Sequence, residues 1–345
     1  MAKPPYHAEQ DGAIGLRATI KDVSAAAGVS IKTVSRVLNN ERYVGAETRE
    51  RVQAAVAALN FRPSLAARSL AGRRSFQIAL VCDNPSPHYL FEIQAGVRDR
   101  CEADGVRMIA QPYDRASPRL IEELLALVDT TQVDGLILTP PITDREDVRA
   151  TLAARGVRTV LVSPGDAAAG PSTRIDNVKA AAVMTRHLLA LGHRRIGFVG
   201  GHPDYATSRQ RAAGHRAALM AGGLDDDPSL FVDGGYDFPS GARAGAVLLE
   251  LPEPPTAIFA ASDEMAAGVL TAAHARGLRL PEDLSVAGFG DDALAGYVWP
   301  PLTTIRQPTR ELGWQAADLL LTHSDERREI AFELVERGST VGVGL

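Results

Sequence analysis

The sequence predicts an α/β protein: an N-terminal all-α head that contains a helix-turn-helix, followed by two doubly wound parallel-sheet subdomains. Three observations support this prediction. Residues 19–62 carry the apolar spacing of short amphipathic helices. From Ser75 onward, short apolar runs alternate with longer helical patterns, as expected for parallel α/β architecture. These strand–helix units are too many for one small sheet, so we expect two subdomains with a ligand cleft between them.

The charge of the chain is unevenly distributed. Of 345 residues, 45% are hydrophobic and 23% are charged, which is ordinary for a globular protein. Residues 19–74 hold ten basic and four acidic side chains, a net charge of +6, whereas the whole chain carries −5. A basic head on an acidic body is typical of a protein whose head alone contacts phosphates.

Cysteine content and hydropathy set the expected compartment. Cys82 and Cys101 show neither a disulfide pattern nor zinc-ligand spacing, so we expect a reducing compartment and no metal or cofactor. Residues 1–18 lack the apolar core of a secretory signal, and we interpret them as a disordered arm. No apolar run is long enough to span a membrane. A cytoplasmic protein is therefore expected.

The expected domain order follows from these patterns. The parts are a helix-turn-helix domain at 19–62, a short helix and linker at 63–74, and a two-lobed α/β domain at 75–345. We expect its N-subdomain to comprise about 75–172 plus 307–332, and its C-subdomain about 173–302 plus 333–345. The expected strands are 77–81, 106–110, 135–138, 159–162, 195–199, 256–259, 284–287 and a last strand at 329–336. The expected helices between them include 88–103, 119–129, 178–191, 208–221 and 265–276.

Capping residues delimit the first two helices of the head. Thr19 is a good N-cap, and Asp22 three residues later makes an acidic variant of the capping box. Gly28 ends this helix and supplies the turn, and Ser30 caps the second helix. In a helix-turn-helix, the exposed residues at the start of the second helix contact base edges and phosphates. A plain αα-hairpin is the alternative interpretation.

Two further helical patterns follow in the head. The first runs from about 47 to 59, with Val52, Val56 and Leu59 on its apolar side. The second covers 63–72 and has Pro63 at its first position and Gly72 as its stop. At about two turns, the second helix is too short to be stable alone in water.

Residues 19–39, TIKDVSAAAGVSIKTVSRVLN, resemble the head of the lactose-repressor/galactose-repressor (LacI/GalR) family. The resemblance continues over most of the chain, at residues 47–52, 59–63, 67–72, 191–193, 209–214, 261–268, 284–289 and 300–308. It implies that 63–74 is a hinge helix with its linker and that 75–345 is a periplasmic-binding-protein-like domain for effector binding and dimerisation. It also implies a transcriptional repressor of carbohydrate metabolism genes. Such a protein binds near-palindromic operator DNA as a homodimer, and a sugar or sugar phosphate controls its affinity. The absence of terminal leucine heptads also favours a dimer over a coiled-coil tetramer.

The resemblance also implies DNA-contacting positions. Ile31, Lys32 and Arg36 match the base-reading positions, where arginine suits guanine and isoleucine a thymine methyl group. Leu70, with Ala67 beside it, matches the leucine that enters the minor groove, although a core leucine is the alternative. Phosphate contacts position a protein on DNA without reading the base sequence. Here they are expected from Thr19, Ser30, Thr33 and Ser35.

Candidate effector-binding residues follow the predicted strands, because ligands bind at the carboxyl ends of strands in doubly wound sheets. The resemblance implies a role for three of them. Arg211 matches an arginine that binds the ligand, Tyr236 matches an aromatic residue that packs on a sugar face, and Ser262 matches a position that is often asparagine or serine in the family. For Arg211 a solvent-facing helix charge remains the alternative, and for Asp83, His88 and Tyr89 an ordinary structural role. The full candidate set is Asp83, His88, Tyr89, Tyr113, Ser163, Arg209, Arg211, Tyr236, Ser262 and Asp291.

One position departs from the family pattern. An aspartate is usual where this chain has Gly290, within Gly288-Phe289-Gly290-Asp291-Asp292. Glycine is flexible and lets the next residues reposition. We therefore expect Asp291 to reach into the effector site, where its carboxylate accepts hydrogen bonds from sugar hydroxyls. The alternative is that effector binding is altered or lost.

Three other functions compete with this interpretation. A free sugar-binding protein of the periplasmic type shares the two-lobed fold, but it predicts a signal peptide and no helix-turn-helix. An enzyme is disfavoured because the histidines and Asp291-Asp292 form neither a metal-ligand spacing nor a nucleophile motif, and no phosphate-binding glycine loop follows a strand. A constitutive architectural DNA-binding protein needs no ligand cleft, so a specific small-molecule response distinguishes it.

Overall fold

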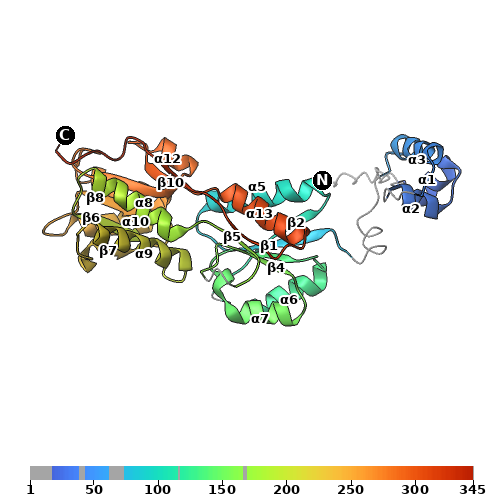
Figure 1. Ribbon diagram of the computed structural model, residues 1–345, viewed down its shortest axis with the longest axis horizontal. Helices are drawn as coiled ribbons and strands as arrows, with labels where there is room; N and C mark the ends of the chain where they lie inside the picture. Colours follow the sequence, from blue (N-terminus) through green and yellow to red (C-terminus); the bar gives the residue numbers. More distant parts are fainter. Residues whose placement is uncertain (1–17, 39–42, 62–73, 116, 166–168, 345) are drawn as a thin grey trace, which may run out of the picture. The chain divides into compact units, whose positions relative to one another are not determined.

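The computed structural model describes residues 18–38, 43–61, 74–115, 117–165 and 169–344. The chain divides into two compact units, Met1–Ser75 and Phe76–Leu345, and each is described by itself (Figure 1). The predicted hinge helix, with Ala67 and Leu70, lies outside the described residues. So does most of the expected N-terminal arm.

The N-terminal unit contains α1 (Ile20–Ala27), α2 (Ile31–Leu38) and α3 (Ala46–Ala58). The Asp22 carboxylate accepts hydrogen bonds from the Thr19 N–H at 2.7 Å and the Thr19 hydroxyl at 2.8 Å. Gly28 ends α1 in the left-handed region with φ 64°. The Ser30 hydroxyl accepts the Thr33 N–H at 3.1 Å and so caps α2. These contacts confirm the predicted helix–turn–helix.

The head has a small apolar core between α1, α2 and α3. Its buried members are Val23, Ala27, Val34, Val37, Val52, Ala55 and Phe61. The expectation that Leu59 faces inward is wrong: Leu59 is 36% exposed and follows the last residue of α3. Its backbone has left the helical conformation, so the helical spacing no longer sets its direction. Phe61, two residues later, is buried instead.

The first sheet of the second unit is parallel throughout, in the order β11-β5-β4-β3-β1-β2. Alternate residues of β1 point to opposite faces, with Ile78 and Leu80 against α5 and α13 and Ala79 and Val81 against α6 and α7. Figure 1 shows these helix pairs on opposite sides of the sheet. The strands are β1 (Gln77–Cys82), β2 (Arg107–Pro112), β3 (Leu136–Leu138), β4 (Thr159–Val162), β5 (Ser172–Arg174) and β11 (Arg327–Glu329). The helices are α5 (Pro87–Ala103), α6 (Leu120–Thr131), α7 (Glu146–Ala154) and α13 (Thr309–Leu321).

The second sheet has the order β12-β10-β9-β8-β6-β7, and β12 alone runs antiparallel to its neighbour. Helices α8 and α9 pack as one pair, and α10 and α11 as another. The strands are β6 (Ile196–Gly200), β7 (Phe231–Asp233), β8 (Ala257–Ala260), β9 (Ser285–Gly290), β10 (Thr303–Arg306) and β12 (Glu333–Val335). The helices are α8 (Asn177–Ala190), α9 (Ala206–Ala221), α10 (Phe238–Leu249), α11 (Asp263–His274) and α12 (Ala293–Tyr297).

The chain crosses between the two sheets three times: after β5, after β10 and after β11. The third crossing corrects the sequence prediction of one last strand at 329–336. The structure has two short strands there, and β11 pairs with β5 in the first sheet while β12 pairs with β10 in the second. The expected boundary between the subdomains, at 332/333, already falls within this stretch, so the error concerns the single strand and not the change of subdomain.

Two glycines bring α5 and α13 close together. A Cβ atom on Gly96 would lie 1.9 Å from the Arg310 carbonyl oxygen, and one on Gly313 would lie 2.3 Å from the Ile93 carbonyl oxygen. Both distances are far below any real carbon–oxygen contact. The close crossing of α5 and α13 therefore requires glycine at both positions.

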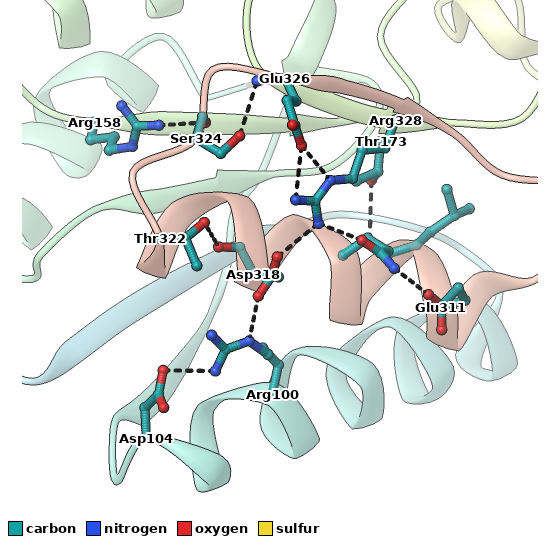
Figure 2. A network of polar contacts seen from close by, with 12 residues as sticks. Arg100, Asp104, Arg158, Thr173, Glu311, Asp318, Thr322, Ser324, Glu326 and Arg328 are labelled. Atoms are coloured by element: carbon teal, nitrogen blue, oxygen red, sulfur yellow. Dashed lines mark hydrogen bonds and ion pairs between the residues drawn. The ribbon is translucent and has the colours of Figure 1, made fainter.

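A polar network joins α5, α13 and β11 (Figure 2). The Asp318 carboxylate accepts hydrogen bonds from Arg100 Nε and from Arg328 Nη1, both at 2.8 Å. Arg328 also contacts Glu326 at 2.9 Å. The Asp318 side chain is only 17% exposed, so these charge-assisted bonds hold β11 against the helix pair just before the chain crosses to the other sheet.

Two absences concern the described residues alone. None of the described helices is both long and apolar enough to cross a membrane. Within the same ranges, no three His, Cys, Asp or Glu side chains are grouped so that they could hold a metal ion.

Candidate DNA-binding and effector sites

The start of α2 presents a mixed apolar and basic surface. Ile31 is 44% exposed although it is a large apolar residue, and Lys32 and Arg36 are exposed as well. Val34 and Val37, on the other face of the same helix, are buried in the core of the head. The packing of α2 therefore leaves the predicted base-reading side chains accessible. Thr19 and Ser30 are exposed too, and Thr33 and Ser35 are partly exposed.

A cleft of about 610 Å³, part of it open to solvent, lies in the second unit. Residues from both sheets line it, mostly at the carboxyl ends of strands. The first sheet contributes Asn84, Ser86, Tyr89, Pro140 and Ser163. The second sheet and its crossing segment contribute Tyr205, Thr207, Arg211, Tyr236, Ser262, Phe289, Gly290, Asp292, Gln307 and Thr309. This cleft, here called the effector pocket, is where ligands bind in doubly wound folds.

Arg211 of α9 lines the effector pocket and is only 7% exposed. Its guanidinium lies 3.6 Å from the centre of the Phe289 ring. It donates to Asn177 Oδ1 at 3.0 Å, to the Ala261 carbonyl at 2.7 Å and to Gln307 Oε1 at 2.9 Å. Burial lowers the pKa of Arg211. Because three of its five N–H groups already bind neutral acceptors, it has only part of its capacity left for a ligand.

Two tyrosine hydroxyls in the effector pocket are buried without a partner among the described residues, those of Tyr89 and Tyr236. Burial raises the pKa of Tyr89 above its ordinary value, so this hydroxyl stays protonated. Tyr236 also has a left-handed backbone with φ 65°, and a Cβ on Gly201 would lie 2.1 Å from its ring. A buried polar group without a partner costs free energy, and strained residues cluster at binding sites. Both hydroxyls therefore point to a hydrogen-bonding ligand.

A set of carboxyl groups lies at one side of the effector pocket. Asp263 is fully buried, and it accepts the Thr304 hydroxyl at 2.6 Å and the Asp292 N–H at 2.8 Å. Burial, together with repulsion from Asp292, raises the pKa of Asp263 to about 7. Burial and the charge of Glu264 likewise raise the pKa of Asp292 to about 7. His88 Nε2 lies 3.4 Å from Asp292 Oδ1.

The structure places five of the ten predicted effector-binding residues in the effector pocket: Tyr89, Ser163, Arg211, Tyr236 and Ser262. Tyr113 and Arg209 line a neighbouring cavity instead, and His88 lines a third one together with Asp291. Asp83 lies 4.0 Å from Arg115, and its carbonyl accepts the Tyr205 hydroxyl at 3.3 Å.

The structure corrects the expectation that Asp291 reaches the effector pocket. The Asp291 carboxylate binds Arg306 Nε at 2.7 Å and Arg337 Nη2 at 2.6 Å, and it is only 8% exposed. Asp292 lines the pocket in its place. Two arginines satisfy Asp291, and the glycine before it, with φ 141°, allows the chain to turn so that the second aspartate faces inward.

Several lining residues did not emerge from the sequence. Ser86 and Tyr205 are the N-caps of α5 and α9, and Thr207 lies in the first turn of α9. Gln307 and Thr309 follow β10, a strand that was not predicted from the sequence. The signal that could have found Gln307 is the run of β-branched residues Thr303, Thr304 and Ile305 just before it.

A helix-turn-helix joined in one chain to a two-lobed domain with a ligand cleft defines a DNA-binding regulator of transcription. Comparison with protein families agrees with this class. Residues 19–64 match the family described as bacterial regulatory proteins, lacI family, and residues 185–340 match the periplasmic binding protein-like domain. The chain belongs to the lacI family of bacterial regulatory proteins.

Relatives and solved structures resemble the chain over nearly its whole length. The HTH-type transcriptional repressor PurR of Vibrio atlanticus is 32% identical over 335 residues, 93% of this chain and 98% of the relative. The ribose operon repressor of Escherichia coli is 34% identical over 332 residues, 93% of this chain and 99% of the relative. The Lac repressor dimer bound to operator and the anti-inducer ONPF is 31% identical, with a TM-score of 0.81 over 94% of this chain and 99% of the other. The complex of the transcriptional regulator CelR with cellobiose is 29% identical, with a TM-score of 0.70 over 94% of this chain and 100% of the other.

Proposed function

We propose that this protein is a repressor of carbohydrate metabolism genes that binds near-palindromic operator DNA as a homodimer and changes its operator affinity when a sugar-like effector binds. The observation that carries the proposal is a recognition helix with an exposed basic and apolar start, in the same chain as a cleft that holds two unpartnered tyrosine hydroxyls. The names of the relatives support it, because they include repressors and a regulator complexed with cellobiose.

In the proposed DNA complex, α2 enters the major groove. Arg36 grips guanine in a bidentate manner, Lys32 contacts a base acceptor, and Ile31 packs on a thymine methyl group. Thr19, Ser30, Thr33 and Ser35 contact phosphates. Ala67 and Leu70 are proposed to enter the minor groove, as the family resemblance implies.

In the proposed effector complex, the ligand binds in the effector pocket. Arg211 donates its remaining N–H groups to ligand oxygens, and Tyr89 and Tyr236 supply hydroxyls that have no partner among the described residues. Asp292 takes the acceptor role that the sequence analysis assigned to Asp291. The protein is proposed to act by binding alone, without catalysis, and to work in the cytoplasm where it reaches the DNA.

Footprinting and salt titration of the full-length protein test the DNA-binding part. We expect a footprint with dyad symmetry on an operator selected from a random-sequence library. We also expect the binding constant to fall steeply with salt, because each neutralised phosphate contributes about −0.9 to the slope of log K against log salt. An asymmetric footprint, or an affinity that does not respond to salt, would contradict the proposed mode of binding.

A further inference from the structure

The start of α9 contacts loops of the first sheet beside the effector pocket. The first sheet with its helices is called here the first lobe, and the second sheet with its helices the second lobe. The Gln210 side-chain amide of α9 donates to the Gly165 carbonyl at 3.3 Å, and the hydroxyl of Tyr205, the N-cap of α9, donates to the Asp83 carbonyl at 3.3 Å. Gly165 and Asp83 follow β4 and β1 of the first sheet. These four residues and Ala206, which begins α9, form a contact between the lobes that is called here the α9 seat.

The lobes are so close at the α9 seat that a side chain on Gly165 does not fit. A Cβ atom on Gly165 would lie 2.4 Å from the Ala206 Cβ, whereas carbon atoms in contact are ordinarily about 3.5–4.0 Å apart. Ala206 is only 6% exposed. The backbone φ of Gly165 lies outside the left-handed region that favours glycine. Glycine is therefore required here by the distance between the lobes and not by a turn.

Gly165 is fixed within its own lobe. Its N–H donates to Asp144 Oδ1 at 2.7 Å. Ser163, two residues earlier, is 5% exposed, and its N–H donates to the Thr173 carbonyl at 2.7 Å. Ser163 also has a left-handed backbone with φ 49°, a conformation that persists only where the surrounding contacts impose it. A larger residue at Gly165 would therefore push the second lobe away, because its own loop is held in place.

The two segments that meet at the α9 seat also line the effector pocket. Ser163 lines it from the first lobe, and Thr207 and Arg211 of α9 line it from the second. Arg211 in turn donates to the Ala261 carbonyl, at the end of β8, at 2.7 Å. A change in the distance across the α9 seat therefore also changes the distance between the groups that face a ligand from the two lobes.

Contacts elsewhere between the lobes are of a different kind. His88 Nε2 of α5 lies 3.4 Å from Asp292 Oδ1, and the Ser86 hydroxyl donates to the Glu264 carboxylate. These pairs join polar side chains, which can rotate when the lobes move. The contact between Gly165 and Ala206 involves only backbone and Cβ positions, which no rotamer change can adjust. The α9 seat can therefore set a firm limit to lobe closure.

We propose that the α9 seat sets how far the two lobes close, and that Gly165 provides the clearance that this closure requires. The consequence for effector binding rests on the proposed function. An effector that contacts both lobes binds best to the arrangement in which they are close together, and it favours that arrangement by its differential affinity. The residue at position 165 should therefore control effector affinity, although Gly165 does not line the effector pocket.

The distance between the lobes in Gly165→Ala tests the proposal without any ligand. Spin labels at Glu122→Cys of α6 and Glu250→Cys at the end of α10 report this distance by pulsed electron paramagnetic resonance. Both glutamate side chains are exposed, and the native Cys82 and Cys101 are buried. Labelled full-length protein is diluted with unlabelled protein, so that distances within one chain are measured. We expect a longer distance in Gly165→Ala than in the wild type, and an unchanged distance would overturn the proposal.

Two further variants separate the contact from a general effect of replacing a glycine. Ala206→Gly removes the opposing Cβ, after which the nearest neighbours of a Cβ at position 165 are atoms of the Asp144 carboxylate at 3.1 and 3.6 Å. The double variant Gly165→Ala/Ala206→Gly should therefore return to the wild-type distance. Gly338→Ala is the matched control, because a Cβ there would lie no closer than 3.6 Å to its neighbours. A double variant as open as Gly165→Ala, or equal opening in Gly338→Ala, would overturn the proposal.

Calorimetric titration of the same variants with D-glucose, D-galactose, D-ribose and cellobiose tests the functional consequence. For a sugar that binds the wild type, Gly165→Ala should lose about tenfold or more in affinity, and the double variant should regain it. Saturating sugar should also change the operator dissociation constant less in Gly165→Ala than in the wild type. Wild-type sugar affinity in a variant with opened lobes would refute the role of the α9 seat in effector binding. If none of these sugars binds the wild type, the sugar-responsive part of the proposed function fails, while the distance measurement still decides whether the seat limits closure.

Discussion

The Tyr236 hydroxyl allows a sharp test of the effector pocket, because removing it should affect stability and ligand binding in opposite directions. The side chain is 7% exposed and lines the pocket, and its oxygen has no partner among the described residues. Tyr236→Phe deletes this oxygen and keeps the ring. Leaving a buried polar group unpaired costs about 1–3 kcal/mol. In the absence of effector, the free energy of unfolding of this variant should therefore be the same as that of the wild type, or higher by up to about 3 kcal/mol.

Effector affinity should fall in the same variant. A hydrogen bond contributes a net of about 0.5–1.5 kcal/mol, which corresponds to about a two- to twelvefold loss in affinity. Urea unfolding without ligand measures the first quantity, and calorimetric titration with the sugar that binds measures the second. Tyr89→Phe should behave like Tyr236→Phe, because the Tyr89 hydroxyl is also buried without a partner.

Tyr113→Phe is the matched control. The Tyr113 hydroxyl accepts the Ile142 N–H at 3.1 Å and lies outside the effector pocket. Its removal should lower the free energy of unfolding by about 1 kcal/mol and leave effector affinity unchanged. If Tyr236→Phe instead destabilises the protein as Tyr113→Phe does, and leaves effector binding intact, the assignment of the Tyr236 hydroxyl to the ligand is refuted.

Four further predictions follow from the two sites and the fold. Arg36→Ala should lose about 1–3 kcal/mol of discrimination at one base position per half-site in a base-substitution scan. In calorimetry, Asp292→Ala should weaken effector binding more than Asp291→Ala does, since only Asp292 lines the effector pocket. Burial raises the pKa of Asp263 from 3.8 to about 7, so the native state holds a proton that the unfolded chain releases, and the free energy of unfolding should fall between pH 4 and 7. Urea titrations at pH 5 and 8 check this, and Asp263→Asn should flatten the difference. Asp318→Asn should lower the free energy of unfolding by about 1.5–3 kcal/mol, because it weakens the bonds to Arg100 and Arg328.

Much of the fold could be predicted from short-range patterns in the sequence. The helix-turn-helix follows from capping at Thr19 and Ser30 and from a left-handed turn at Gly28, and each depends on a few neighbouring residues. The long buried strands, such as β1, follow from runs of apolar residues. The short strands β5, β7 and β11 have three residues each, which is too few for a periodic pattern.

The features that could not be predicted from the sequence depend on contacts between residues that are far apart along the chain. The apolar pattern of residues 329–336 predicts one strand across the expected subdomain boundary at 332/333, whereas β11 and β12 are separate strands that pair in different sheets. Spacing alone could not show that Arg306 and Arg337 satisfy Asp291, because these arginines lie 15 and 46 residues away along the chain. Arg211 was found from the sequence, but the stacking on Phe289 that makes it part of the buried framework was not.

The central claim is that effector binding and operator binding are coupled in one chain. Fluorescence anisotropy of the full-length protein on its selected operator, with and without a saturating free sugar that binds the effector pocket, measures this coupling directly. Coupling free energies of about 1–3 kcal/mol are typical, so the operator dissociation constant should change by about 5- to 150-fold, and Arg211→Lys should reduce the change. An operator dissociation constant that stays the same at saturating sugar, for a protein shown by calorimetry to bind that sugar, would contradict the account.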